Sequence, residues 1–451
     1  MSQLTSSRYE VRAGWDDQNR LIGWLSFPRK KSSSTDENLR PSSGTFSSSN
    51  LRPSAPRSTG CLTSGDSPRF EYAPAWLQDG FALGADLPLV AGAQTPLPGH
   101  RGFGFLRDRL PSAEAETLLL SHPTVRESDA LAGASRLEMA AVALPASAVA
   151  YGGLLFYGLD DELSPLPVHH VDTLPDLIYA IHAFERGKLP DKEAVGLTES
   201  ALVADDRLSL TLISQRRPVS IVVPSVSDPI DVPFWRAFGL RMAKACGIDV
   251  VETAFEKHLG ESVLRLERAD RQVSPVTSTL RDVVRPAKLM TCASAATLTE
   301  RLDRRTDRAT AVSYLAIADI LNRDGAAPAE DLPKLWDRLV YTLLTNRAGD
   351  RADRWHFYRT EHGWRPLPAH NLEWLPASLG TGRGLRLTAD GRRPLLEAED
   401  ALALAPYFAL RQRDAKMRLF AIRRTLFDWE AQALDAGAAP GDIALMASLF
   451  D

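Results

Sequence analysis

The chain has few of the features that mark secreted, membrane or nucleic-acid-binding proteins. Its three cysteines, Cys61, Cys246 and Cys292, are far apart and match neither a zinc-binding spacing nor a disulfide framework, which suits a reducing compartment. No apolar run approaches the ~18 residues of a membrane span, and the N-terminal MSQLTSSRYEV has no apolar signal core. The formal net charge of −4 gives no global attraction to nucleic acid or anionic lipid. We therefore expect a cytoplasmic protein without a membrane segment.

Beyond these absences, the composition is that of an ordinary globular protein. Hydrophobic residues make up 44% and charged residues 24% of the 451 positions, enough for two or three domains with sizeable cores. Residues 8–27 alternate apolar and polar side chains about a DDQN turn, which predicts two strands. Residues 28–68 hold serine clusters and a repeated NLRPS, at 38–42 and 50–54, and this composition predicts a disordered insertion.

The remaining periodicity predicts a mixed α+β protein in three parts. These are a small domain at 1–160, an α/β lobe at 161–272 and a mainly helical lobe at 273–451. Predicted helices lie at about 102–120, 134–144, 173–186 and 232–246, the last ending at Gly247. Predicted strands lie at 151–157, 207–214, 219–224 and 263–268, and a short hairpin lies at about 355–366.

Residues 335–374 are the most informative stretch. An apolar helix runs into a polar loop, then a hairpin, then the Pro-bounded turn Pro368-Ala369-His370-Asn371-Leu372. Kinase-like enzymes place their catalytic base on such a loop and a metal-holding residue on the turn that follows such a hairpin.

Short motifs in a shared order resemble the HipA family, bacterial serine/threonine kinase toxins of toxin–antitoxin systems. The resemblance covers most of the chain outside the serine-rich segment. It is carried by FEYAPAWL with the following LPL, by Gly152-Gly153-Leu154-Leu155-Phe156, by Pro224-Ser225, by Ala243-Lys244-Ala245-Cys246-Gly247-Ile248, by Glu267-Arg268-Ala269-Asp270-Arg271, by Ser294-Ala295-Ala296-Thr297-Leu298, by Ser313-Tyr314-Leu315 and by Gly363-Trp364. The resemblance implies a two-lobed kinase-like fold with an additional N-terminal domain.

At the nucleotide-binding positions that the resemblance implies, this chain lacks the side chains that bind the nucleotide in the family. The lysine that neutralises phosphate falls on Val222, and its glutamate partner falls on Arg236. The chain has no glycine between Leu197 and Phe238 and no lysine between Lys192 and Lys244. The expected glycine-rich loop reads ALVADDR, whose carboxylates would repel ATP. The positions expected to meet adenine are Glu267 and Ala269.

The catalytic and metal positions are exchanged as well. Matched from Asn346, the position of the base is Ala348, which cannot accept a proton, and Asp353 replaces the asparagine that holds metal. If the alignment with the family's motif were shifted by two residues, Asp350 would occupy the position of the base. The metal-binding aspartate after the hairpin becomes Asn371, although Mg²⁺ prefers a charged carboxylate.

These exchanges predict a catalytically inactive pseudokinase that acts by binding proteins. No cofactor is expected, and ATP with Mg²⁺ would serve only if activity were retained. The resemblance implies a helix-turn-helix antitoxin of the HipB type as partner, or a paired active kinase, with DNA reached only through the partner.

Two alternatives remain open at this stage. The first is an active or rearranged serine/threonine kinase that phosphorylates a translation factor such as glutamyl-tRNA synthetase, using Asp350 and Asp353 with His356 or His370 nearby. The second is direct nucleic-acid binding by basic side chains, for which a solvated helix face is the plainer interpretation. Those side chains are Arg347, Arg351, Arg354, Arg411, Arg413, Lys416, Arg418, Arg423 and Arg424.

Overall fold

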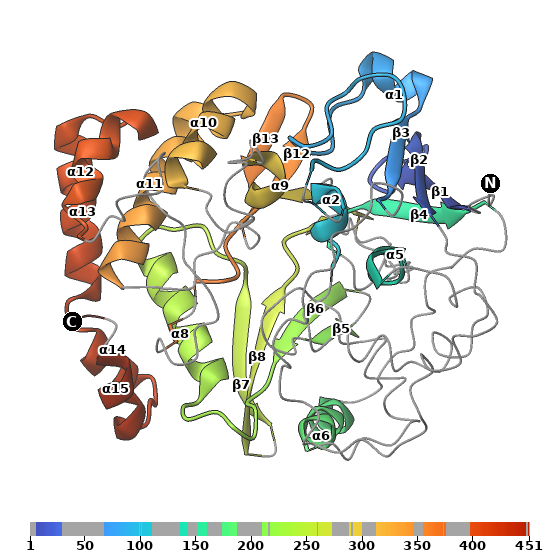
Figure 1. Ribbon diagram of the computed structural model, residues 1–451. Helices are drawn as coiled ribbons and strands as arrows, with labels where there is room; N and C mark the ends of the chain where they lie inside the picture. Colours follow the sequence, from blue (N-terminus) through green and yellow to red (C-terminus); the bar gives the residue numbers. More distant parts are fainter. Residues whose placement is uncertain are drawn as a thin grey trace, which may run out of the picture. The chain divides into compact units, whose positions relative to one another are not determined.

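The structure is a computed structural model of the 451-residue chain (Figure 1). Most of the predicted serine-rich insertion, residues 111–120 of the predicted 102–120 helix and the predicted loop at 346–354 lie outside the residues that it describes. Within residues 102–110, the helix covers only Gly104–Arg107. The described residues are 6–28, 67–98, 100, 102–110, 136–142, 151–159, 174–186, 210–214, 217–258, 260–272, 288–289, 292–299, 313–345, 355–372, 374–375, 397–447 and 450.

Contacts between residues divide the chain into two units. Unit 1 comprises Met1–Ser220 and Arg271–Thr291, and unit 2 comprises Ile221–Asp270 and Cys292–Asp451. The predicted division at residues 160 and 272 stays a prediction. The mixed α and β composition that the sequence predicts is confirmed.

Unit 1 is built on a four-stranded antiparallel sheet in the order β3-β2-β1-β4. The predicted pair of strands about the DDQN turn is confirmed as β1 and β2, which pair in antiparallel register. Alternate residues of β1 are buried, as the period of a strand with one covered face requires. The four strands are β1 (Ser6–Ala13), β2 (Leu21–Pro28), β3 (Arg69–Tyr72) and β4 (Leu154–Gly158).

Short helices accompany this sheet, and aromatic side chains dominate the core of unit 1. Phe70 packs edge-on against Tyr72 and Phe105, with ring centroids 5.0 and 5.5 Å apart. The predicted helices at 134–144 and 173–186 are confirmed. The helices are α1 (Pro74–Asp79), α2 (Gly104–Arg107), α5 (Arg136–Val142) and α6 (Leu174–Glu185), and the small strands β9 (Arg271–Gln272) and β10 (Lys288–Leu289) pair with each other.

A buried carboxylate ties α5 to β1. Glu138 is fully buried and accepts a hydrogen bond from the hydroxyl of Tyr9 at 2.7 Å and another from the hydroxyl of Ser7. Buried carboxylates are tolerated when hydrogen-bond donors replace water, so these hydroxyls account for Glu138 in an apolar core.

A second sheet, in the order β5-β6-β8-β7, lies beside the long helix α8 (Val232–Ala245). Asp231 caps α8 by accepting a hydrogen bond from the backbone N–H of Phe234 at 3.1 Å. Gly247 follows the helix with φ +82°, which confirms the predicted helix end. The strands are β5 (Leu210–Ser214), β6 (Arg217–Val222), β7 (Thr253–His258) and β8 (Glu261–Glu267).

Helices make up most of the described residues in the remainder of unit 2, around the central α11 (Pro328–Leu344). The predicted hairpin at 355–366 is confirmed as β12 (His356–Thr360) and β13 (Gly363–Pro366). The other elements are β11 (Cys292–Ser294), α9 (Ala295–Thr299), α10 (Tyr314–Asp324), α12 (Asp400–Leu404), a 3-10 turn (Ala405–Phe408), α13 (Gln412–Leu426), α14 (Trp429–Asp435) and α15 (Pro440–Met446).

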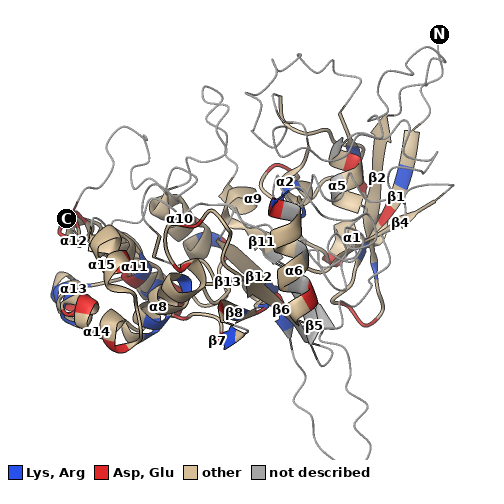
Figure 2. Ribbon diagram, turned by 90° about the horizontal axis from the view of Figure 1, so that it is seen from below, with Lys and Arg blue, Asp and Glu red and all other residues tan. Residues whose placement is uncertain are grey.

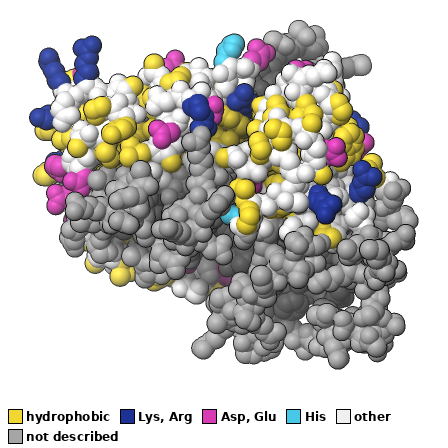
Figure 3. Space-filling model, turned by 45° about the horizontal axis from the view of Figure 1, so that its top comes forward, with side chains coloured by type: hydrophobic (Ala, Val, Ile, Leu, Met, Phe, Trp, Pro, Cys, Tyr) yellow, Lys and Arg dark blue, Asp and Glu magenta, His cyan; other side chains and the backbone are white. Residues whose placement is uncertain are grey.

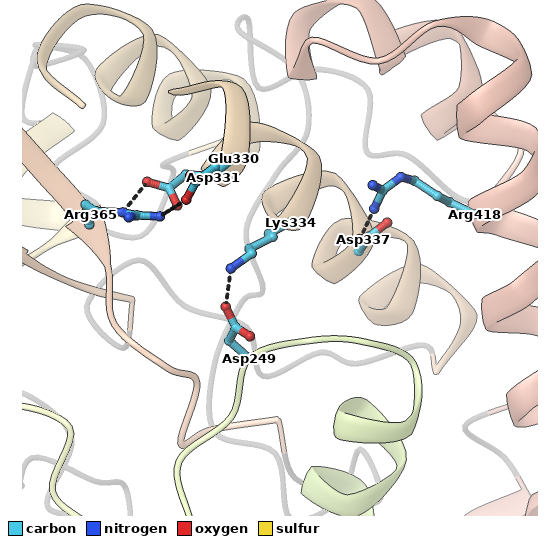
Figure 4. A network of polar contacts seen from close by, with 7 residues as sticks. All are labelled: Asp249, Glu330, Asp331, Lys334, Asp337, Arg365 and Arg418. Carbon is cyan, nitrogen blue, oxygen red and sulfur yellow. Dashed lines mark hydrogen bonds and ion pairs between the residues drawn. The ribbon is translucent and has the colours of Figure 1, made fainter. Parts of the chain in front are cut away.

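Ion pairs connect α11 to three other parts of unit 2 (Figure 4). Lys334 reaches Asp249 after α8 at 2.6 Å, and both side chains are exposed, so this pair adds little stability. Asp331 is 3% exposed and pairs with Arg365 on β13 at 2.8 Å, and Asp337 is 9% exposed and pairs with Arg418 on α13. The last two pairs fix the orientation of α11 within the unit.

Asp337 gives a prediction about pH. Burial raises the pKa of Asp337 from 3.8 to about 6, although Arg418 acts in the opposite direction. Because the folded protein binds this proton more tightly than the unfolded chain, the contribution of Asp337 to stability is present below pH 4 and is lost as the pH rises to 6. We expect Asp337→Asn, whose amide does not titrate, to gain stability relative to wild type between pH 4 and pH 7, by up to about 3 kcal/mol.

Urea unfolding of both proteins across this range measures the difference. A constant difference between the two, independent of pH, would show that Asp337 titrates at the same pH in the folded and unfolded states.

Of the helices that the structure describes, none combines the length and apolar character that crossing a bilayer requires.

Candidate functional site

The predicted site residues divide into those that the structure describes and those that it does not. Ala348, Asp350 and Asp353, the positions of the base and of one metal ligand, lie outside the described residues. Val222, Arg236, Glu267, Ala269 and Asn371 are all described, and all five belong to unit 2. Their surroundings can therefore be compared with what phosphate, adenine and metal require.

The two predicted phosphate-binding positions are buried, and neither carries the group that the family has there. Val222 is the last residue of β6 and is 1% exposed. Arg236 lies in the first half of α8 and is 2% exposed. A lysine–glutamate pair at these positions would hold a phosphate oxygen and fix the lysine. An aliphatic strand residue and a buried arginine on the helix cannot form that pair.

The two predicted adenine positions flank Arg268, which forms a buried ion pair with Asp270. The sequence motif by itself does not indicate this pair. Glu267 is exposed at the end of β8, and Ala269 is partly buried. Between them, Arg268 donates from Nε and Nη2 to the two carboxylate oxygens of Asp270, at 2.8 and 2.7 Å. Both side chains are almost fully buried, so this bidentate pair holds the turn after β8 in one conformation. Arg268 and Asp270 of the Glu267–Arg271 motif thus have a structural role.

The predicted metal position, Asn371, is hydrogen-bonded to a cation of the protein itself. Asn371 is 1% exposed, and its Oδ1 accepts a hydrogen bond from Nη2 of Arg338 on α11 at 3.0 Å. The guanidinium carbon of Arg338 lies 3.4 Å from the centroid of the Trp355 ring, so the cation is held between the amide and the indole. The one neutral oxygen that Asn371 could offer to Mg²⁺ is therefore used by a permanent positive charge, which would also repel the metal.

The turn that carries Asn371 is packed directly against α8. Gly239 of α8 lies so close that an added Cβ would be 2.7 Å from both the Leu372 oxygen and the Trp374 nitrogen. Tyr341 of α11 donates its hydroxyl to the Gly239 oxygen at 2.7 Å and accepts from the Trp374 indole N–H at 2.8 Å. The helix that bears Arg236 and the turn that bears Asn371 thus form one tightly packed junction.

Aromatic rings surround this junction. Trp374 is fully buried and packs on Phe238, Trp429 and Phe450, with ring centroids 5.2, 5.7 and 4.9 Å away. One weak signal for this junction is present in the sequence: Gly239 lies in the middle of an otherwise good helix, and such a glycine often marks a close packing contact.

The structure brings together the two histidines of the rearranged-kinase alternative. The rings of His356 and His370 stack with centroids 5.6 Å apart and planes at 30°. Asp350 and Asp353, the other members of that hypothesis, lie outside the described residues. Within the described ranges, no three His, Cys, Asp or Glu side chains come close enough to hold a metal ion.

The basic residues proposed for nucleic-acid binding do not act as one group. Arg418 and Arg423 form ion pairs with Asp337 and Glu399. Figure 2 shows that α13 carries both basic and acidic positions. The exposed side chains of Arg411, Arg413, Lys416 and Arg424 point to solvent, while Arg347, Arg351 and Arg354 lie outside the described residues.

Comparison with known proteins gives matches in structure alone. No protein-family model and no curated protein matches the sequence. A structure of HipA from Shewanella oneidensis, solved with HipB and its operator DNA as a toxin–antitoxin complex, matches with a TM-score of 0.58 at 15% identity and covers 98% of this chain and 94% of that one. The Helicobacter pylori proinflammatory kinase CtkA matches 51% of this chain and 94% of its own, at 11% identity and a TM-score of 0.30, which is too low to carry an argument. Over nearly its whole length, the chain has the fold of the HipA toxin, as its short motifs predicted.

Proposed function

We propose that this chain is a HipA-like protein of a toxin–antitoxin system that has lost phosphoryl transfer and acts by binding another protein. The observation that carries the proposal is the hydrogen bond from buried Arg338 to the side-chain oxygen of Asn371, at the position where a kinase would hold Mg²⁺. A metal ion at this point would have to displace a guanidinium that is already packed on Trp355.

The residues at the predicted phosphate-binding positions support the proposal independently. A strand lysine is replaced by Val222, and Arg236 stands where its glutamate partner would be. The sequence supplies no glycine between 197 and 238 for a loop whose backbone could approach phosphates. Loss of a general base alone costs roughly 10²–10⁴-fold in rate. Loss of the lysine and a metal carboxylate as well would leave little activity, even though such effects are not additive.

ATP with Mg²⁺ is therefore a poor fit to the described residues. The groups present at the phosphate and metal positions are an aliphatic side chain, a buried arginine and an amide bound to a second arginine.

The proposed partner is a helix-turn-helix antitoxin of the HipB type or a paired active kinase, with any DNA contact made through that partner. The support is the fold shared over 98% of the chain with a HipA that was solved together with HipB and operator DNA. A binding role requires the surface of the fold but none of its catalytic groups. Substitution of those groups therefore does not prevent it.

A rearranged kinase is the second candidate, and the stacked pair His356 and His370 favours it. These residues lie after the loop that contains Asp350 and Asp353, so a base or metal site built from them would need no lysine. This candidate also predicts phosphate transfer that Asp350→Ala abolishes.

The experiment is incubation of the purified full-length chain with [γ-³²P]ATP and Mg²⁺, alone and with glutamyl-tRNA synthetase. The proposal predicts no phosphate in either protein above a no-enzyme control. Incorporation that is lost in Asp350→Ala would establish the second candidate instead. Incorporation that survives Asp350→Ala would contradict both.

A further inference from the structure

The outer face of α13 is chemically unlike an ordinary solvated helix surface. The helix buries Ala415, Leu419, Ile422 and Leu426 against unit 2. At about 100° per residue, five other side chains of the helix and that of Phe427, which follows the helix in helical conformation, fall within an arc of about 100° on the other side. We call them the α13 outer face, and they are Arg413, Lys416, Met417, Phe420, Arg424 and Phe427.

The apolar members of this face are unusually exposed. Phe427 is 89% exposed, Phe420 is 69% exposed and Met417 is 54% exposed. Isolated exposed apolar residues are normal on protein surfaces, but three large ones along one helix face mark an interaction site more often than chance exposure does. The spacing from Met417 to Phe420 and from Phe420 to Phe427 is three and seven residues, the pattern by which a helix presents anchors to a groove.

The charged members of the face are all cations. The side chains of Arg413, Lys416 and Arg424 make no hydrogen bond or ion pair to any other described residue. The neighbouring arginines of the same helix differ, because Arg418 pairs with Asp337 and Arg423 pairs with Glu399. Figure 3 shows basic side chains projecting beside hydrophobic ones at the left edge of the molecule, the side on which Figure 1 places α12 and α13.

We propose that the α13 outer face docks into an apolar groove with an acidic rim on a partner protein. The two phenylalanines and the methionine would enter the groove, and the three cations would meet carboxylates at its edges. Arg and aromatic side chains are the residue types that dominate binding energy in such interfaces. Opposite charge on the partner speeds association and suppresses wrong partners.

Three other occupants fit the face less well. A second copy docked symmetrically would place three cations against three cations. A lipid surface would need anionic headgroups to meet the three cations, and the net charge of −4 gives the chain no general attraction to such a surface. Single-stranded nucleic acid would use the cations and the rings, but would leave Met417 without a partner group.

This inference rests on the proposed function in one respect, that the chain acts by binding a protein. It does not depend on whether the chain transfers phosphate. A chain that transfers phosphate and also binds through α13 would contradict the proposed function and leave this inference standing.

The experiment begins with photo-crosslinking in the native cell. Benzoylphenylalanine replaces Phe420 in one full-length chain and Tyr179, an exposed aromatic residue of α6, in a control chain. We expect one discrete protein adduct at position 420 that is absent at position 179. That protein is then purified and titrated against wild type, Phe420→Ala, and the triple variant R413E/K416E/R424E.

The inference predicts that each variant weakens binding by about 10-fold or more, and that salt weakens the binding of wild type. Circular dichroism confirms that the variants are folded, as expected for exposed positions. No adduct at position 420, or an adduct protein that binds all three chains equally, would overturn the inference. So would binding of wild type, lost in the same variants, to a 20-nucleotide single-stranded DNA or to phosphatidylserine vesicles.

Discussion

Replacing Gly239 with alanine is expected to destabilise unit 2 by about 2 kcal/mol, since overpacking a close contact typically costs 1–3 kcal/mol. In most helices the same change would stabilise, because alanine is favoured over glycine by about 1 kcal/mol in a helix interior. Here the new Cβ would lie 2.7 Å from two backbone atoms, the Leu372 oxygen and the Trp374 nitrogen. Backbone cannot rotate away as a side chain can, so α8 and the Asn371 turn must separate.

The matched control is Gly441→Ala in α15. An added Cβ at Gly441 has no atom within 4 Å, so this variant should be neutral or slightly more stable. Urea unfolding followed by far-ultraviolet circular dichroism measures both. Equal stability of Gly239→Ala and Gly441→Ala would contradict the close contact between α8 and the turn.

Replacing Trp374 with alanine is expected to have the largest effect on stability, a loss of about 3–5 kcal/mol typical of a buried aromatic residue. The indole is fully buried, contacts Phe238, Trp429 and Phe450, and donates a hydrogen bond to the Tyr341 hydroxyl at 2.8 Å. The variant would lose this packing, leave a cavity and free the hydroxyl that also bonds the Gly239 oxygen.

Two comparisons separate these contributions. Trp374→Phe keeps a ring and removes the N–H donor, so its loss should be clearly smaller, on the order of 1–2 kcal/mol. Tyr407→Ala removes a ring that is 59% exposed, and it should change stability by less than about 0.5 kcal/mol. Equal losses for Trp374→Ala and Tyr407→Ala would contradict the central position of Trp374.

The local elements could be predicted from the sequence because short-range patterns determine them. The alternation at 8–27 predicted β1 and β2, and the periodicity at 232–246, followed by Gly247, predicted α8 with its end. The kinase-like outline at 335–374 came from a helix, a loop, a hairpin and a turn in that order, and α11, β12 and β13 bear it out. The two strands and α8 depend on patterns within about 20 residues, and the kinase-like outline depends on the order of elements along the 40 residues of 335–374.

The contacts that define the candidate site could not be predicted, because they join residues far apart in the chain. Arg338 lies 33 residues before Asn371, and Tyr341 lies 102 residues after Gly239. The sequence suggested Asn371 as a weak metal ligand, but it gave no reason to expect Arg338 on its oxygen. Likewise, Arg268 and Asp270 were assigned to a family motif, whereas their bidentate pair is visible only in the structure.

Calorimetric titration of the full-length chain with ATP in excess Mg²⁺ measures whether the predicted nucleotide and metal positions still hold a magnesium-bound triphosphate. We predict no saturable heat up to millimolar ATP, which corresponds to a binding free energy weaker than about −4 kcal/mol. Val222→Lys alone should give the same result, because Arg338 still occupies the Asn371 oxygen. Saturable, magnesium-dependent binding of ATP to the wild-type chain in the micromolar range would contradict the account.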